Sequence, residues 1–184
     1  MSRLSIPARA DAPEAAQPIL DAVHRQLGAV PNMFRLFSTS PAALTGLTGL
    51  DAANAKTLDL KTRTGIALAV AQVNRCSYCL SAHSYIGLNL AKISSEEVRL
   101  NRQGKSGGTK VAAAVHFATK VAEARGQVGD DDLAAVRKAG YSDAQVVEIV
   151  SVIAQNFLTN LINNVAQTDI DFPVVSADDL KAAA

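Results

Sequence analysis

The segment from Asp59 to Asn74 is the part of this 184-residue chain that most strongly constrains its fold. Every side chain between Ile66 and Ala71 is apolar, and alanine is frequent within the segment. Strands in globular proteins are usually shorter than this, and alanine is the strongest helix former. We therefore expect a helix over residues 59–74 that is buried in the core.

Helix start and stop signals divide the rest of the chain into further helical segments. Proline or a capping Ser or Asp precedes most of them, and glycine follows several, as is typical of helix ends. No convincing pair of strands and no tandem repeat is found, so the sequence predicts an all-α fold. Besides 59–74, helices are expected over residues 11–28, 31–37, 40–50, 76–90, 110–124, 130–140 and 142–162, with another beginning at Ser94.

The length of the chain fits one domain with a substantial core, and we expect a single domain over residues 1–184. Residues 1–12 lack strong periodicity and are interpreted as an N-terminal arm. Residues 169–184 are interpreted as an extended C-terminal tail, because the run from Ile170 to Val175 contains Pro173 and β-branched residues.

Composition and charge exclude several classes of function. A hydrophobic content of 48% with 19% charged residues is typical of a soluble globular protein. The net charge of +1 gives no general field that would attract nucleic acid or anionic lipid. The apolar run at 66–71 is far shorter than the roughly 18 residues that a membrane span requires, and residues 1–16 lack the apolar core of a secretory signal. We therefore expect a cytoplasmic protein without nucleic-acid or membrane partners.

Both cysteines of the chain, Cys76 and Cys79, lie within four positions, and His83 follows one helical turn later. On a helix these three side chains share one face, and Cα atoms three residues apart are close enough for a disulfide. In a cytosolic protein, a lone pair of this spacing is more typical of catalysis, redox sensing or metal binding than of a structural disulfide. The pattern predicts a redox-active dithiol, with His83 accepting or delivering a proton.

The electrostatics of a helix start favour a thiolate at this place. If both cysteines lie in the first helical turn, the positive end of the helix and the cation of Arg75 both stabilise an anionic sulfur. This argument makes the outer residue, Cys76, the more acidic thiol.

Two other interpretations of the cysteines remain open. In one they are small buried hydrophobic residues without chemistry. In the other they bind zinc with His83, and His24 or His116 would have to supply the fourth ligand of a structural site. The leading interpretation includes no metal and no cofactor.

Other candidate motifs carry less weight. The run Gly104-Lys105-Ser106 resembles the end of a phosphate-binding loop, but that motif needs a glycine where Arg99 stands, and no strand precedes it. His24, His116 and Glu148 lie in helical patterns without partner chemistry, and we interpret them as ordinary surface or half-buried residues.

The stretch from Thr64 to His83 closely resembles the alkylhydroperoxidase AhpD/carboxymuconolactone decarboxylase-like superfamily, and within it the peroxidase-related branch. The resemblance is specific over residues 58–92 and 142–175. It implies an AhpD-like, all-helical subunit assembled as a homotrimer or homohexamer. Decarboxylases proper lack the cysteine pair, so decarboxylation is disfavoured. The downstream pattern that supports the resemblance consists of Asn156, Asn160, Asn163, Thr168, Asp169, Ile170, Asp171, Phe172 and Pro173.

The resemblance also implies roles for the site residues. It makes Cys79 the peroxidatic cysteine, which becomes a sulfenic acid, and Cys76 the resolving cysteine, which closes a disulfide, with His83 in proton transfer. A dithiol donor, such as a lipoyl or thioredoxin-like protein, would reduce that disulfide. We follow the resemblance for these roles because thiolate fraction alone does not decide which sulfur a peroxide can reach.

The chain departs from the family pattern at three supporting positions. Thr64 stands where a proton-relay Glu is usual, Tyr78 where a His is frequent between the cysteines, and Arg75 where a Gly is common. Threonine can hydrogen-bond but cannot act as a base near neutral pH. Arg75 is the candidate to compensate by stabilising a thiolate.

The sequence thus predicts a thiol-dependent peroxidase that reduces hydrogen peroxide or organic hydroperoxides. The main alternative is a redox sensor or disulfide-exchange module that uses the same pair without efficient peroxide turnover. A metal-binding or purely structural oligomer is the third hypothesis.

Overall fold

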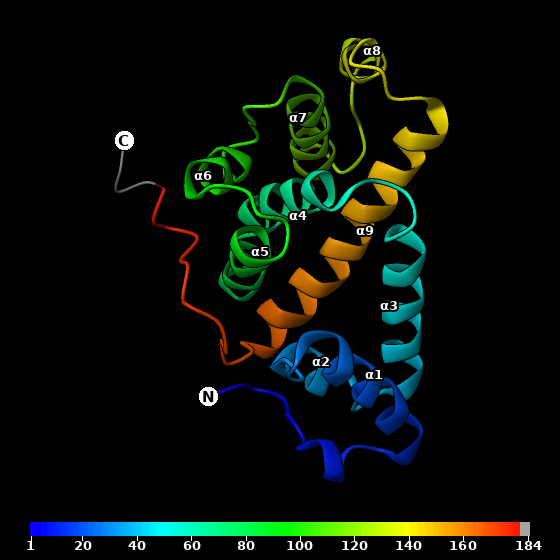
Figure 1. Ribbon diagram of the computed structural model, residues 1–184, viewed down its shortest axis with the longest axis vertical. Coiled ribbons are helices and arrows are strands. Elements are labelled where there is room, and N and C mark those ends of the chain that lie inside the picture. Colours follow the sequence, from blue (N-terminus) through cyan, green and yellow to red (C-terminus); the bar gives the residue numbers. More distant parts are fainter. Residues whose placement is uncertain (181–184) are drawn as a thin grey trace.

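A computed structural model describes residues 1–180, and within that range all regular secondary structure is helical (Figure 1). The all-α prediction is therefore confirmed. Two short 3-10 helices, Arg9–Asp11 and Glu14–Ala16, precede the first α-helix. The α-helices of the described chain are α1 Gln17–Leu27, α2 Asn32–Phe37, α3 Pro41–Asn54, α4 Leu60–Val73, α5 Ser77–Asn89, α6 Ser95–Arg102, α7 Thr109–Glu123, α8 Asp130–Lys138 and α9 Asp143–Ala166.

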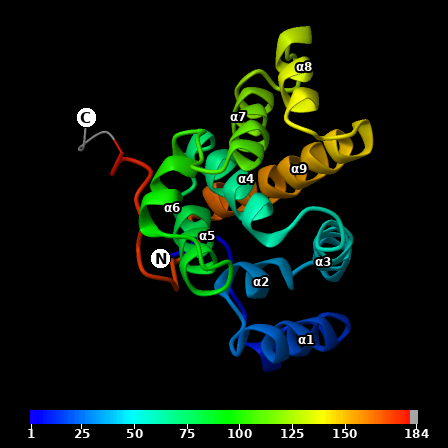
Figure 2. The same cartoon turned by 45° about the horizontal axis from the view of Figure 1, so that its top comes forward.

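Helix α4 is the centre of the structure, as the sequence predicts. It begins after Asp59, whose carboxylate accepts a hydrogen bond from the Thr62 amide at 3.0 Å. Residues 64–71 are all buried, and α4 packs against α5, α6, α7 and α9 (Figures 1 and 2).

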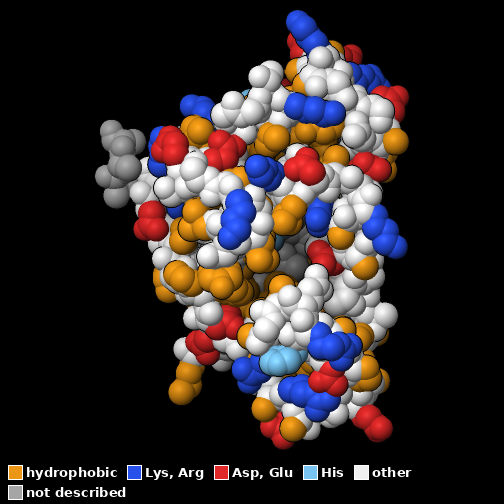
Figure 3. Space-filling view, viewed as in Figure 1, with side chains coloured by type: hydrophobic (Ala, Val, Ile, Leu, Met, Phe, Trp, Pro, Cys, Tyr) orange, Lys and Arg blue, Asp and Glu red, His pale blue; other side chains and the backbone are white. Residues whose placement is uncertain are grey.

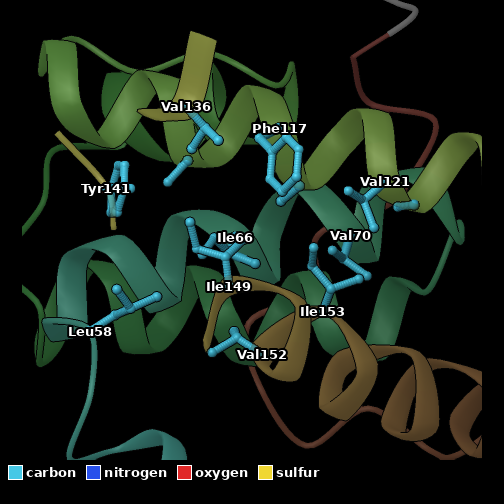
Figure 4. Packing of buried hydrophobic residues seen from close by; sticks show 13 residues of the cluster. Leu58, Ile66, Val70, Phe117, Val121, Val136, Tyr141, Ile149, Val152 and Ile153 are labelled. Atoms are coloured by element: carbon cyan, nitrogen blue, oxygen red, sulfur yellow. The ribbon is translucent and has the colours of Figure 1, made fainter. Parts of the chain in front are cut away.

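The main hydrophobic core lies between α4, α7, α8 and α9. Figure 4 shows Ile66 and Val70 of α4 facing Phe117 of α7 on one side and Ile153 of α9 on the other. Burial of this kind is the main favourable contribution to folding, at roughly 25 cal/mol per Å² of apolar surface. The buried members of the cluster are Leu58, Ile66, Val70, Ala114, Phe117, Ala118, Val121, Ala122, Val136, Tyr141, Ile149, Val152 and Ile153.

Gly65 allows the neighbours of α4 to approach it closely. A Cβ atom at this position would lie 2.8 Å from Cγ2 of Val115 on α7 and 3.0 Å from Oδ1 of Asn101 on α6. Both distances are too short for a carbon contact, so the packing of three helices depends on the missing side chain.

The first helix begins later than the sequence predicts. Residues 9–16 form two 3-10 turns, and α1 starts at Gln17 rather than near Asp11. A helix starting at 11 would place Pro18 in its interior, where the missing N–H removes a backbone hydrogen bond. In the observed helix Pro18 lies in the first turn, where no such bond is needed. The predicted end at Gly28 is confirmed, with φ 77°.

Helices α1 to α3 pack together at one end of the molecule, around Leu20, Phe37, Leu44 and Leu47 (Figure 1). The N-terminal arm is tied to this end, because the Arg35 guanidinium donates to the carbonyl oxygens of residues 6 and 7 at 3.2 and 2.8 Å.

Residues 169–180, which we call the C-terminal strap, cross the outside of α5 and α6 (Figure 1). The backbone amides of Val175 and Ala177 donate to Ser81 Oγ and Ser77 Oγ of α5, at 2.9 and 3.3 Å. Arg102 of α6 donates to the Ser176 carbonyl at 2.7 Å. The strap is irregular through residue 176 and ends in a turn, and the last four residues of the predicted tail lie outside the described residues.

Helix α9 has 24 residues and contains an 18-residue window with a mean hydropathy of 1.3, so by length and composition alone it could cross a membrane. The sequence argument from the run at 66–71 overlooks this helix. In the structure α9 packs against α3, α4, α5 and α7 and buries Asn156, Asn160 and Asn163. Only 33% of its apolar window is buried, so one face of α9 belongs to the core and the opposite face is exposed.

The close contact at Gly65 generates a stability prediction. Gly65→Ala should lower the free energy of unfolding by about 1–2 kcal/mol, because overpacking outweighs the better helix propensity of alanine. The control is Gly49→Ala on α3, where a Cβ meets nothing within 4 Å, and which should raise stability by about 0.5–1 kcal/mol. Urea unfolding of both variants measures the two effects. Equal gains in stability would show that α7 does not constrain position 65.

Candidate active site

The turn between α4 and α5 positions the cysteine pair. Helix α4 ends at Val73 with Asn74 as its C-cap, and Arg75 adopts a left-handed conformation with φ 52°. The Arg75 amide donates to the Gln72 carbonyl at 3.1 Å and the Cys76 amide to the Ala71 carbonyl at 2.9 Å. These two bonds form a Schellman motif, which usually has glycine at the left-handed position. The family glycine that Arg75 replaces thus has a conformational role in this turn.

Cys76 lies outside the helix that it precedes. The sequence argument places both cysteines in the first turn, but Cys76 is the N-cap of α5, with extended backbone (φ −91°, ψ 95°). Its Sγ accepts a hydrogen bond from the Cys79 amide at 3.5 Å. Cys76 is extended because the left-handed residue before it ends α4 and the new helix needs a capping acceptor.

The two cysteines lie side by side as buried free thiols. The exposed fraction is 0% for Cys76 and 2% for Cys79. A hydrogen bond from Cys76 is the main reason that the pKa of Cys79 lies below its ordinary value, although burial acts in the opposite direction. The same hydrogen bond, together with burial, raises the pKa of Cys76. The order of acidity is therefore the reverse of the one that the helix-start argument predicts.

Polar side chains of α9 face the Cys79 sulfur. The Asn163 amide Nδ2 lies 3.4 Å from Cys79 Sγ and donates to it. The hydrogen bond from Asn163 and the nearby polar groups of Asn160 and Thr159 each lower the pKa of Cys79. The Asn160 Nδ2 is buried without a partner in the hydrogen-bond network of residues 1–180, so it is free to donate to a thiolate. Neutral donors therefore stabilise the anion of a buried thiol.

A cavity of about 700 Å³ opens beside Cys79. It lies between α1, α2 and α3 on one side and α4, α5 and α9 on the other. Figure 3 shows the molecule hollowed on this face, with acidic and basic side chains among hydrophobic ones at the rim. Cys79, His83 and Thr64 line this cavity, whereas Cys76 is not among its lining residues. A small molecule in the cavity thus meets one sulfur of the pair.

His83 is the titratable group beside Cys79 on the same helix. Burial lowers its pKa to about 4, although the negative charge of Asp51 and a hydrogen bond to Asn156 act in the opposite direction. The Asn156 Nδ2 donates to the Val152 carbonyl at 2.8 Å, which leaves the Asn156 carbonyl oxygen to accept from the imidazole. His83 is therefore neutral at pH 7 and able to accept a proton.

The three supporting residues from the sequence lie in different surroundings. Thr64 is buried on α4 and lines the cavity, where it brings a hydroxyl and no carboxylate. The Arg75 guanidinium pairs with Asp178 of the strap at 2.7 Å, on the exposed surface. Its cation is therefore engaged with a carboxylate in the strap rather than dedicated to a thiolate.

Tyr78 connects α5 to α2 and to the C-terminal strap. Its hydroxyl donates to Asp171 Oδ1 at 2.9 Å and accepts from the Met33 amide at 3.0 Å. Its ring packs edge-on against Phe172, with centroids 5.9 Å apart. Burial raises the pKa of Tyr78 well above its ordinary value. Tyr78 thus joins α5 to α2 and to the strap, one residue before the reactive sulfur.

The structure gives no support to the other sequence candidates. Within residues 1–180, no group of three or more His, Cys, Asp or Glu side chains is arranged to hold a metal ion. In the loop that resembles a phosphate-binding motif, the Glu97 carboxylate accepts from Ser106 Oγ and from the Gly107 amide at 2.9 Å. The donors of this loop are thus engaged by an acid of the chain itself.

Sequence reasoning missed two contributions to the site. It noted the asparagines of α9 only as a family pattern and did not connect them with Cys79. Their spacing of three or four residues within an apolar helix was the available signal. Asp51 of α3, which also lines the cavity, carries no motif that would have revealed it.

Comparison with known proteins places this geometry in a family. Residues 39–123 match the Carboxymuconolactone decarboxylase family. No curated protein matches the chain at a significant level.

Solved structures give a likeness over nearly the whole chain. An alkylhydroperoxidase AhpD core, a peroxidase-related protein from Ralstonia eutropha JMP134, is 26% identical, with a TM-score of 0.82 and 92% of each chain covered. A peroxidase-related protein from Silicibacter sp. TM1040 is 23% identical, with a TM-score of 0.79 and 91% of each chain covered.

A third structure with the same fold is that of a protein named for a different activity. It is a cysteine-to-alanine variant of the debrominase Bmp8 in complex with 2,3,4-tribromopyrrole. It is 18% identical to this chain, with a TM-score of 0.78, and the match covers 98% of this chain and 96% of Bmp8. The match over residues 39–123 thus relates this chain to the carboxymuconolactone decarboxylase/AhpD-like family, and its fold is similar to that of peroxidase-related AhpD core proteins.

Proposed function

We propose that the protein is a thiol-dependent peroxidase that uses Cys79 to reduce hydrogen peroxide or organic hydroperoxides. The observation that carries this proposal is the asymmetry of the cysteine pair. Cys79 has the lowered pKa and lines a cavity, while Cys76 is hydrogen-bonded behind it and has the raised pKa. A nucleophilic thiolate that faces a substrate cavity, backed by a second thiol, is the arrangement that peroxide reduction needs.

The first step is attack by the Cys79 thiolate on the terminal oxygen of the hydroperoxide. A sulfur–oxygen bond forms as the oxygen–oxygen bond breaks, and the leaving alkoxide takes up a proton to become an alcohol, or water from hydrogen peroxide. Cys79 is then a sulfenic acid. The Cys76 thiol attacks this sulfur, the S–OH bond breaks, and water leaves as the disulfide forms.

A dithiol reductant completes the cycle. One thiol of the reductant attacks the disulfide to form a mixed disulfide, and its second thiol closes a new disulfide within the reductant. Cys76 and Cys79 then regain their protons. A lipoyl group or a thioredoxin-like protein has this dithiol chemistry, and we propose one of these as the partner.

His83 is proposed to take the proton from the Cys79 thiol. Both residues line the cavity, and they lie one turn apart on α5. The imidazole is neutral over the range where most cytoplasmic enzymes work, because its pKa is lowered to about 4.

The alternative function, a redox sensor or disulfide-exchange module, is favoured by the loss of the carboxylate at Thr64. The debrominase Bmp8 shares the fold, so the fold alone does not select a reaction. The cysteine pair and its cavity support the peroxidase over this alternative.

We also propose that subunits associate through α9, which carries a stripe of exposed apolar side chains three or four residues apart. Such a stripe is typical of a helix that packs against another helix. This surface suits the homotrimer or homohexamer that the family resemblance implies. The residues of the stripe are Val147, Val150, Ala154, Leu158, Leu161 and Val165.

Variants of the two cysteines test the proposed cycle. Cys79→Ser should reduce peroxide consumption with dihydrolipoamide to the uncatalysed rate, since no nucleophile faces the cavity. Cys76→Ser should consume one equivalent of peroxide and stop at a sulfenic acid that dimedone traps. Wild type should lose two thiols per equivalent of peroxide without forming a covalent dimer. Efficient turnover by Cys79→Ser would overturn the peroxidase, and loss of both thiols without sustained turnover would favour the sensor.

Removal of one hydrogen-bond donor to the Cys79 sulfur tests how the thiolate is stabilised. Asn163→Ala should raise the pKa of the Cys79 thiol by about one unit, because a single hydrogen bond to an anion is worth about 1.5–3 kcal/mol, partly replaced by water. The rate of iodoacetamide alkylation as a function of pH measures this pKa. The matched control is Asn164→Ala, whose exposed amide donates to the Asn74 carbonyl and not to sulfur. Equal thiol pKa values in the two variants would contradict the assignment.

The lowered pKa of His83 predicts a specific dependence of stability on pH. The unfolded state binds a proton at His83 below pH 6.5, whereas the folded state does so only below about pH 4. Stability from this group is therefore full above pH 6.5 and falls as pH drops from 6.5 to 4. The difference in unfolding free energy between wild type and His83→Gln should shrink over that window by on the order of 1–3 kcal/mol. Urea unfolding at pH 7, 5.5 and 4.5 measures it, and a constant difference would show that His83 titrates normally.

A further inference from the structure

A carboxylate reaches the cavity from a helix that the sequence motif does not include. Asp51 lies on α3, and its side chain lines the same cavity as Cys79 and His83. Thr64, the residue at the usual relay position, also lines this cavity but cannot carry a negative charge. The cavity therefore has an acid on its α3 wall and none at position 64.

A chain of hydrogen bonds between α3 and α9 holds this carboxylate in place. Gln155 of α9 donates from Nε2 to Asp51 Oδ1 at 2.7 Å. Gln155 Oε1 in turn accepts from Asn54 Nδ2 at 2.7 Å, and Asn54 Oδ1 accepts from Ser151 Oγ at 2.8 Å. Each amide is oriented by the next, and Asn54 is buried. The network fixes which end of Gln155 faces the carboxylate and so keeps Asp51 at the cavity wall.

The other charged and titratable groups at the cavity do not replace Asp51. Within the described chain these groups are Arg63 of α4 and Tyr78, Cys79 and His83 of α5, while the lining residues from α1, α2 and α9 are uncharged. Arg63 donates from Nε to the Leu58 carbonyl at 3.0 Å. Tyr78 is engaged with Asp171 and Met33. Asp51 thus supplies the negative charge among the residues that line the cavity.

The charge of Asp51 acts on His83 in the direction that proton transfer needs. Burial disfavours the imidazolium, and Asp51 is the charged residue that raises the pKa of His83 against this effect. A carboxylate that favours the imidazolium makes the neutral imidazole a stronger base toward the Cys79 thiol.

We propose that Asp51 is the positioning carboxylate of His83, supplied from α3 by the Gln155–Asn54–Ser151 network in place of the acid missing at Thr64. The proton leaves the Cys79 sulfur, the S–H electron pair stays on sulfur as the thiolate, and the proton bonds to an imidazole nitrogen of His83. Asp51 remains ionised and stabilises the resulting imidazolium. The inference rests on the proposed role of Cys79 as the nucleophile.

Asp51→Asn tests the inference without removing the hydrogen bond to Gln155, because the amide oxygen of Asn can still accept from Nε2. Histidine titration by NMR gives the pKa of His83, and the spectrum of His83→Gln assigns its signal among the three histidines. Alkylation by iodoacetamide in the Cys76→Ser background gives the reactivity of Cys79 alone. We expect a lower His83 pKa and an alkylation rate at pH 7 about tenfold lower.

A matched control and a second background separate charge from structure. Asp131→Asn removes an exposed acid on α8, at the far end of the molecule (Figure 1), and should change neither readout. In the His83→Gln background, Asp51→Asn should no longer slow alkylation, because the group through which it acts is absent.

The outcomes distinguish this inference from the proposed function. An unchanged His83 pKa, an unchanged alkylation rate or an equal effect of Asp51→Asn without His83 would overturn the role of Asp51. If the wild-type protein fails to consume peroxide while Asp51→Asn still lowers the His83 pKa and the alkylation rate, the proposed peroxidase is overturned. The role of Asp51 toward His83 is then still supported.

Discussion

The complete burial of α4 is the constraint on which the rest of the structure depends. Because residues 64–71 have no exposed face, four helices must pack around them, and Gly65 lets α6 and α7 come close enough to do so. The end of this helix then decides where α5 starts. A left-handed residue at Arg75 turns the chain so that Cys79 lies under α9 instead of in solvent. The reactive sulfur is thus positioned by core packing and a single turn.

The helices could largely be predicted from the sequence because capping residues mark where they begin. Asp59, Ser94 and Ser142 cap helices as expected, and each accepts a hydrogen bond from an amide three residues on. The start of α1 differs from the prediction because Pro18 is tolerated in the first turn of a helix but not in its interior, which outweighs a cap at Asp11. Of the candidate site, the sequence predicted only the residues close together in the chain at α5, namely Cys76, Cys79 and His83.

The remainder of the site could not be predicted because it comes from segments far apart in the chain. Asn163 contacts a sulfur 84 positions earlier, and Gln155 holds a carboxylate 104 positions earlier. Neither contact leaves a periodic or compositional sign at the cysteine motif. The acidity of the two thiols was predicted in the wrong order for the same reason. A helix end and a nearby cation were visible in the sequence, while the neutral donors that face Cys79 were not.

The capping role of Cys76 means that the first turn of α5 is itself sensitive to oxidation. The atom that accepts from the Cys79 amide is the same sulfur that would bond covalently to Cys79 in a disulfide. A disulfide sulfur keeps its lone pairs, but the covalent bond to Cys79 Sγ fixes its position and so limits how well it can still accept from the Cys79 amide. The strap is bound to this same turn through Ser77. The sulfur that would be oxidised is therefore also part of the cap of α5, one residue from the side chain that binds the strap.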